Sequence, residues 1–240
     1  MPTSAFAADS GLRAGALVLG IDTCGPSGSV ALARLASDGL KLLGQTELAG
    51  RSYSATLVAA VGDLLKQYRI ALKDLGAIVA VHGPGSFTGV RVGLSALKGL
   101  AEPFGIPVAV ASRLEVLAHL AGVQAAALDA HRQEVFLRIE AAGAKVREVL
   151  AGKAELAGFA TISGPIAICE DAAEEWVRAV WPEAVIQRVA APTAADAIEL
   201  VAPQLRAGKF VDLALLDGHY LRRSDAEIFG ETLQTVARGA

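Results

Sequence analysis

The chain has 240 residues, of which 53% are hydrophobic, 5% aromatic and 20% charged, and its formal net charge is −3. This length suits one large domain or two lobes with an aliphatic core. The small negative charge argues against a protein that binds nucleic acid through the electrostatic attraction of its overall charge. Two cysteines make no disulfide framework, so a reducing cytoplasm is the expected compartment. No apolar run is long enough for a membrane span, and residues 1–15 lack a signal-peptide pattern, so we expect a flexible tail and no membrane.

The first half of the chain begins with three short apolar segments joined by turns, which predict an antiparallel meander at residues 16–22, 29–35 and 41–48. A helix follows, with Ser54 as a plausible N-cap. Its predicted apolar stripe consists of Leu57, Val58, Val61, Leu64, Leu65 and Tyr68. A buried strand at 77–81, a helix opening at Ser86 and a strand at 107–111 complete this half.

The second half repeats the theme. Its apolar segments predict strands at 124–129, 134–140, 146–153, 166–169 and 185–189, and helices at 172–180 and 193–205. A duplicated βββαβα unit of this size is the plan of the actin-like ATPase folds, an α/β class with two lobes that each have a mixed sheet flanked by helices. We therefore expect four parts: the tail at 1–15, lobes at 16–106 and 107–218, and a C-terminal segment at 219–240.

The centre of the sequence is the turn GPGSFTG at 83–89, between the strand at 77–81 and the helix after it. Several backbone N–H groups converge where a glycine turn opens a helix, which favours an anion. It is not a Walker motif, because no Gly-Lys-Ser/Thr follows. The candidate nucleotide- or anion-binding residues are Asp22, Thr23, Gly83, Gly85 and Ser86.

Two of the binding interpretations stay open at this point. Asp22, at the end of the first strand, could hold a metal-bound phosphate, or its carboxylate could cap the N–H groups of the following turn. The spacing of Gly83, Gly85 and Gly89 also resembles a dinucleotide loop, and Arg113 could then receive a 2′-phosphate. Against the dinucleotide hypothesis, the loop follows a three-strand meander and does not open a βαβ unit.

The helix after the turn has two useful faces. Val90, Leu94, Leu97 and Ala101 form a core-facing stripe. Gly89, Gly93 and Ala96 form a second face that is poor in side chains. Glycine inside a helix costs roughly 1 kcal/mol against alanine, so two on one face indicate close packing, and a partner chain could be what packs there.

No convincing catalytic set follows from the residue pattern. The histidines His82, His119, His131 and His219 form no HxxxH or HExxH pair. Cys24 has no local partner that would make it a nucleophile, and Ser86 is not in a GxSxG elbow. Asp129, His131 and Glu134 could form an acid–base group, although such residues at a strand–turn–strand more often face solvent or satisfy the turn.

The stretch GPGSFTGVRVGLSALKGLA (83–101) resembles the TsaB family, also called YeaZ. LGIDTCGPSGSVAL (19–32) is similar to the opening hairpin of that family, and ALDAHRQEVF (127–136) and YLRRSDAEI (220–228) resemble two of its later segments. The resemblance runs from about Leu17 to Ile228, nearly the whole chain.

The resemblance implies an actin-like ASKHA fold and a role as the non-catalytic paralogue of TsaD. In that family, TsaB, TsaD and TsaE together form N6-threonylcarbamoyladenosine beside the anticodon of tRNAs that read ANN codons. TsaD holds its metal with an HxxxH motif, and the matching positions here are Ser112 and Val116, which are no ligand pair. The resemblance therefore implies a scaffold or activator with no catalysis of its own, no metal and no required cofactor, with ATP or ADP binding left open.

The resemblance also implies partners: TsaD in a heterodimer, TsaE, a second copy when the chain is alone, and tRNA only through the complex. The family's partner surface uses the two helices at 54–69 and 87–101. The implied interface residues are Tyr53, Leu57, Val61, Leu64, Phe87, Gly89, Val90, Gly93, Leu94, Ala96 and Leu97. Many relatives have histidine where Tyr53 stands, so this position could alter partner preference.

Alternatives remain at this stage. An actin-fold ATPase or small-molecule kinase would use Asp22, the glycine turns and Asp129 as a second acid. A peptidase, a label once attached to TsaD relatives, would need a nucleophile or metal set that the sequence lacks. Whether Arg222 and Arg223 touch tRNA is open, since two adjacent arginines near a C-terminus are more often solvated or salt-bridged.

Overall fold

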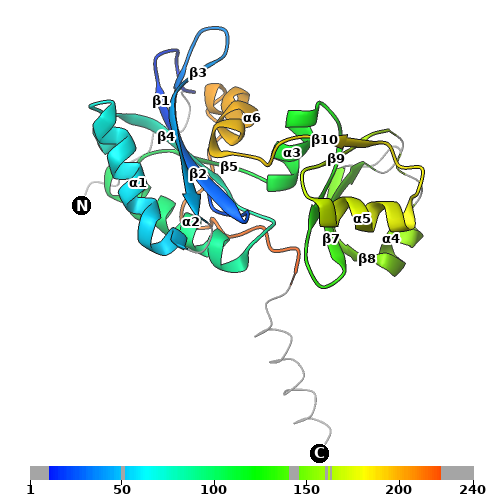
Figure 1. Cartoon of the computed structure of the whole chain (residues 1–240). Coiled ribbons are helices and arrows are strands. Elements are labelled where there is room, and N and C mark those ends of the chain that lie inside the picture. The colour runs from blue at the N-terminus through cyan, green and yellow to red at the C-terminus, as the bar shows by residue number, and fades with distance from the viewer. Residues whose placement is uncertain (1–10, 50–51, 141–145, 160–161, 163, 223–240) are drawn as a thin grey trace, which may run out of the picture.

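Two mixed sheets of the same design form the framework of the chain in the computed structural model (Figure 1). The structure describes residues 11–49, 52–140, 146–159, 162 and 164–222. The first sheet has the order β3-β2-β1-β4-β5, and the second, counted from its other edge, has the order β8-β7-β6-β9-β10. In each, the central strand is antiparallel to the strand after it and parallel to the next one across. The predicted duplication is confirmed.

The first sheet contains the meander and the strand before the glycine turn. Its strands are β1 (Leu17–Asp22), β2 (Ser27–Leu35), β3 (Leu40–Ala49), β4 (Leu75–Val81) and β5 (Val108–Ala111). Helices α1 (Tyr53–Gln67) and α2 (Phe87–Ala101) cover one face of it, and the short 3-10 turns Leu72–Asp74 and Glu102–Phe104 lie in the connections. Every residue of β1 is buried, as expected for an apolar strand at the centre of a sheet.

The second sheet is smaller. Its strands are β6 (Ala125–Asp129), β7 (Glu134–Glu140), β8 (Val146–Gly152), β9 (Ile166–Ile168) and β10 (Ile186–Arg188). The helices of the second half are α3 (Arg113–Ala121), α4 (Lys153–Gly158), α5 (Asp171–Val180) and α6 (Ala194–Arg206). Helices α3 and α4 were not expected from the sequence, because both are short and follow a strand almost directly.

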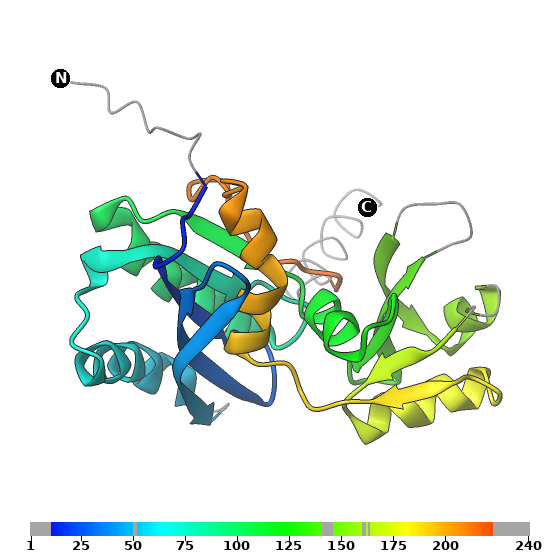
Figure 2. The same cartoon turned by 90° about the horizontal axis from the view of Figure 1, so that it is seen from above.

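The two lobes exchange their last helices. Helix α3 follows β5 but packs on β6, β7 and β9, whereas α6 follows β10 but packs on the first sheet. Figure 2 shows α3 and α6 next to each other between the sheets, where they are in contact. The expected division after residue 106 therefore needs correction. It falls between paired strands β4 and β5 of one sheet, and α6 packs on that same sheet.

Both ends of the described chain are tied to the fold. Leu12 N donates to Leu205 O (2.8 Å) and Gly15 N donates to Leu35 O (2.7 Å), so residues 11–15 are not the flexible tail that was expected, and 1–10 lie outside the described residues. After α6 the chain returns along the first lobe, where Val211 N donates to Val108 O (2.8 Å). No helix among the described residues is long and apolar enough to cross a membrane.

Candidate functional site

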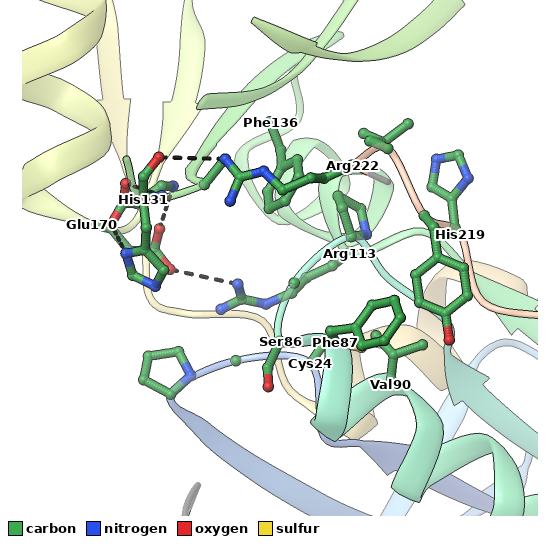
Figure 3. A pocket seen from close by; sticks show the side chains of 18 of the residues that line it. Cys24, Ser86, Phe87, Val90, Arg113, His131, Phe136, Glu170, His219 and Arg222 are labelled. Atoms are coloured by element: carbon green, nitrogen blue, oxygen red, sulfur yellow. Dashed lines mark hydrogen bonds and ion pairs between the residues drawn. The ribbon is translucent and has the colours of Figure 1, made fainter. Parts of the chain in front are cut away.

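A cavity of about 800 Å³ lies between the lobes (Figure 3). Its walls come from the turn after β1, the turn and start of α2, the segment after β6, and the returning chain at 219–222. Three of these follow the carboxyl ends of β1, β4 and β6, where ligands collect in α/β folds. The predicted residues Gly85 and Ser86 line the cavity, while Asp22, Thr23 and Gly83 do not.

The glycine turn is shaped by contact with the turn after β1. Gly83 has φ of +118°, a conformation that favours glycine. A Cβ at Gly85 would lie 2.3 Å from the carbonyl oxygen of Cys24, and Ser86 N donates to that same oxygen at 2.8 Å. Ser86 then caps α2, since its Oγ accepts from Gly89 N at 3.2 Å. The glycines are thus explained by packing inside the chain.

Asp22 acts as a turn cap. Its Oδ1 accepts from Cys24 N at 2.8 Å, and the side chain is buried. Burial raises the pKa of this carboxyl, while the nearby Arg113 charge works in the opposite direction. Its Oδ2 has no hydrogen-bond partner among the described residues. Of the two interpretations left open by the sequence, the structure shows the capping contact.

Arg113, at the start of α3, joins the two lobes. Its side chain is buried, and Nη1 lies 3.5 Å from Glu170 Oε1, just before α5 (Figure 3). Although burial favours the neutral form, the carboxylates of Asp22 and Glu170 outweigh it and raise the Arg113 pKa. Glu170 Oε2 in turn accepts from Asp129 N at 2.6 Å. The sequence had suggested Arg113 only for a dinucleotide, and Glu170 not at all as a site residue.

The three residues suggested as an acid–base group, Asp129, His131 and Glu134, lie in two separate ion pairs. Asp129 Oδ2 lies 2.8 Å from His131 Nδ1, and Asp129 Oδ1 accepts from His131 N at 2.8 Å. Glu134 pairs with Arg222 instead. The described residues contain no group of three or more His, Cys, Asp or Glu side chains placed to share a metal ion.

A second polar network crosses between the lobes at Ser112, one of the two positions that the sequence resemblance matched with the HxxxH motif of TsaD. Glu148 on β8 accepts from Ser112 Oγ (2.6 Å) and Arg138 Nη1 (2.8 Å), and its Oε2 lies 2.8 Å from His219 Nε2. Burial tends to raise the Glu148 pKa, but these hydrogen bonds outweigh burial and lower it. Val116, the second motif position, is fully buried in the core. Sequence spacing alone could not reveal this network, because its members are far apart in the chain.

The small face of α2 packs within the chain, which corrects the expectation of a partner helix there. A Cβ at Gly89 would lie 2.0 Å from Thr23 O, and one at Gly93 would lie 2.3 Å from Thr23 Oγ1. Ala96, the third member, is half-buried against the first lobe's core. The close approach that the pattern indicated exists, but the neighbour is the turn after β1.

Most of the expected interface side chains are likewise internal. Those buried in the core of the first lobe are Tyr53, Leu57, Val61, Leu64, Val90, Leu94 and Leu97. Tyr53 donates from its hydroxyl to Gly25 O at 2.9 Å, so it fixes the turn after β1 and offers no surface to a partner. Phe87 is half-buried, and its ring centroid lies 4.9 Å from that of Tyr220, with the two ring planes tilted by 47°.

The outward face of α1 carries different residues from those expected. Val58, assigned to the apolar stripe by the sequence, is 59% exposed. Ala55, Ala59 and Gly62 are also exposed, and a Cβ at Gly62 would meet nothing within 4 Å. The periodicity was ambiguous here, because Val58 is adjacent in sequence to the buried Leu57.

Two repeated mixed sheets with exchanged helices, and a cavity at the ends of their central strands, define a protein of the actin-like ASKHA class. A family model described as TsaD, tRNA N6-adenosine threonylcarbamoyltransferase, matches residues 45–204. The solved structure of YeaZ from Pseudomonas aeruginosa has a TM-score of 0.68 and 25% sequence identity, covering 86% of this chain and 100% of that one.

Sequence comparison gives the same relationship. The tRNA threonylcarbamoyladenosine biosynthesis protein TsaB of Bacillus subtilis (strain 168) is 39% identical over 90 residues, 36% of this chain and 39% of that protein. TsaB of Escherichia coli (strain K12) is 34% identical over 125 residues, 50% of this chain and 52% of that protein. The chain thus aligns with about half or less of these curated relatives. It belongs to the TsaB (YeaZ) family.

Proposed function

We propose that this chain is a non-catalytic subunit that supports formation of N6-threonylcarbamoyladenosine in tRNA, with TsaD and TsaE as its partners in the cytoplasm. The observation that carries the proposal is its likeness to proteins named for the biosynthesis of that nucleoside. In this proposal TsaD catalyses the threonylcarbamoyl transfer. The two positions of this chain that match the metal motif of TsaD hold Ser112, which is hydrogen-bonded to Glu148, and the buried Val116.

The outer face of α1, together with the neighbouring outer face of α2, is the proposed docking surface for TsaD or a second copy. Helices α1 and α2 contact each other on one face of the first sheet (Figure 1). Val58 supplies exposed apolar area, and the open space at Gly62 on α1 and Gly99 on α2 leaves room for close approach of a partner helix. A subunit docked there can activate TsaD only by binding its active conformation better than its inactive one.

An omission assay tests the proposal. TsaC, TsaD, TsaE, ATP, threonine, bicarbonate and a substrate tRNA are mixed with and without this chain, and modified adenosine is quantified. The proposal requires that modification depends on the chain. Equal modification without it would contradict the proposal.

The alternative of an actin-fold ATPase is tested separately, by measuring ATP turnover of the isolated chain. Turnover above background, lost in Asp129→Asn, would favour the enzyme. We expect no turnover, because Asp22 is occupied as a turn cap and Asp129 is paired with His131. Binding of ATP or ADP without turnover is compatible with the subunit role.

A further inference from the structure

The returning chain at 219–222 is held closely against the glycine turn of the first lobe. His219 N donates to His82 O at 2.7 Å, and the two imidazole rings stack with their centroids 5.4 Å apart. A Cβ at Gly83 would lie 2.8 Å from His219 O, so the turn has no room for a side chain at this point. The first glycine of the turn therefore allows the close approach of the returning chain.

Side chains of the same segment reach the second lobe. His219 Nε2 lies 2.8 Å from Glu148 Oε2 on β8. Arg222 forms an ion pair with Glu134, the first residue of β7, and its Nη2 also donates to His131 O at 3.5 Å (Figure 3). Two residues of the segment thus bind the second lobe, although the backbone of the first of them is bonded to the first lobe.

Tyr220, between these two residues, turns back to helix α2. Its ring centroid lies 4.9 Å from that of Phe87, the first residue of α2. The Arg91 guanidinium lies 3.8 Å from the Phe87 ring centroid and 6.0 Å from that of Tyr220, which adds cation–π attraction. The segment therefore connects the second lobe to the start of α2, in addition to the covalent connections between the lobes.

We propose that residues 219–222 form a clasp that holds the second lobe against the start of α2, and that the lobes move apart when the clasp is broken. The clasp stabilises the closed arrangement through contacts that the parted arrangement lacks, and those of His219 and Arg222 cross between the lobes. The coupling is reciprocal, so a change at Phe87 or Arg91 on α2 also loosens the clasp. This inference goes beyond the proposed subunit role, and its failure would leave that role standing.

The test measures the distance between the lobes by pulsed electron paramagnetic resonance. Nitroxide labels are attached at Val58→Cys on α1 and Val185→Cys directly before β10, since these positions are 59% and 63% exposed. The two native cysteines, Cys24 and Cys169, are replaced by alanine so that only the chosen positions are labelled. The chain with an intact clasp should give one narrow distance.

The key variant is His219→Ala/Arg222→Gln, which removes both contacts with the second lobe. Each lost contact to a charged group should raise the ratio of parted to closed molecules roughly tenfold. From a minor state of the usual population, the double variant should then show a second, longer distance in at least about a tenth of the molecules. One narrow distance, as in the unaltered chain, would overturn the proposal.

The matched control is His119→Ala/Arg178→Gln. His119 is exposed on α3, and Arg178 forms its ion pair with Glu174 within α5, so neither belongs to the clasp. The control should keep the single narrow distance. A longer distance of equal weight in the control would contradict a specific role of residues 219–222.

Glu134→Gln gives an answer even if the double variant does not fold, because it breaks the Arg222 ion pair from the opposite lobe. It should produce the longer distance by itself, and adding Arg222→Gln to it should change the distribution little, since both substitutions break the same contact. A distribution like that of the unaltered chain, or effects that add, would contradict the clasp.

Discussion

The hydroxyl of Thr23 donates a 2.7 Å hydrogen bond to the carbonyl oxygen of Gly89, in the first turn of α2. The same hydroxyl oxygen would lie 2.3 Å from a Cβ placed at Gly93. These contacts fasten α2 to the end of β1 with no room for a side chain between them. The glycines of α2 are therefore needed for the fold of this chain before any partner is present.

Gly93→Ala should destabilise the chain by about 1–3 kcal/mol, because the new methyl group would force Thr23 away from its contact. Gly99→Ala on the same helix is the control, since a Cβ there meets nothing within 4 Å, and it should stabilise by about 0.5–1 kcal/mol. Urea unfolding measures both. Equal effects of the two substitutions would show that Gly93 is not a close contact.

Tyr53→Phe should cost about 0.5–1.5 kcal/mol of stability, because the hydroxyl bond to Gly25 O is lost while the ring stays in the core. Binding to TsaD, measured on the folded variant, should be unchanged. A weakened complex with unaltered unfolding would instead return Tyr53 to the interface, where the family resemblance had placed it.

Glu148 should make stability depend on acid pH. Its pKa in the folded chain is below the ordinary value of 4.5, so the unfolded chain binds more protons in that range. Its contribution is fully present above about pH 4.5 and is lost as pH falls through the lower folded value. Glu148→Gln should lower the free energy of unfolding by about 1.5–3 kcal/mol at pH 7. It should also make the loss of stability on acidification less steep.

The control for this experiment is Glu47→Gln, on an exposed position of β3. Urea midpoints between pH 3 and 7, about the range in which carboxyl groups titrate, are compared for the three chains. A Glu148→Gln profile parallel to that of the unaltered chain would show that the contacts with His219, Ser112 and Arg138 add no pH-dependent stability.

Val58→Asp should weaken binding to TsaD by at least about 2 kcal/mol, roughly thirtyfold, because a charge would enter a desolvated apolar contact. Its effect on stability should be small, since Val58 is 59% exposed. Val185→Asp is a matched control, a valine of the other lobe that is 63% exposed. Titration calorimetry measures the affinity of each variant for TsaD. Equal affinities of Val58→Asp and Val185→Asp would rule out the outer face of α1 as the docking surface.

Local patterns in the sequence predicted much of the fold. The spacing of Val90, Leu94 and Leu97 gave α2 and its buried side, and Ser86 was placed correctly at its start. Pairing between distant segments was harder. The strand at 107–111 was predicted, but its place beside β4 depends on a parallel crossover, and no local signal assigns α3 and α6 to opposite sheets.

In the candidate site, too, local sequence patterns did not identify contacts between distant residues. Glycines at 89 and 93 correctly indicated a close neighbour, but a pattern along one helix does not say whether that neighbour is Thr23 or another chain. Arg113 and Glu170 are 57 residues apart, so their pairing follows only from the fold. Of the two arginines left open, Arg222 pairs with Glu134, and Arg223 lies outside the described residues.

The measurement that tests the central claim most directly is the initial rate of threonylcarbamoyladenosine formation in the reconstituted mixture, with the unaltered chain, Val58→Asp or Val185→Asp at a concentration near the dissociation constant for TsaD. We predict equal initial rates with the unaltered chain and Val185→Asp, and a lower rate with Val58→Asp that is restored when its concentration is raised. Modification that is the same with Val58→Asp, or that needs no added chain, would contradict an activating subunit docked through α1.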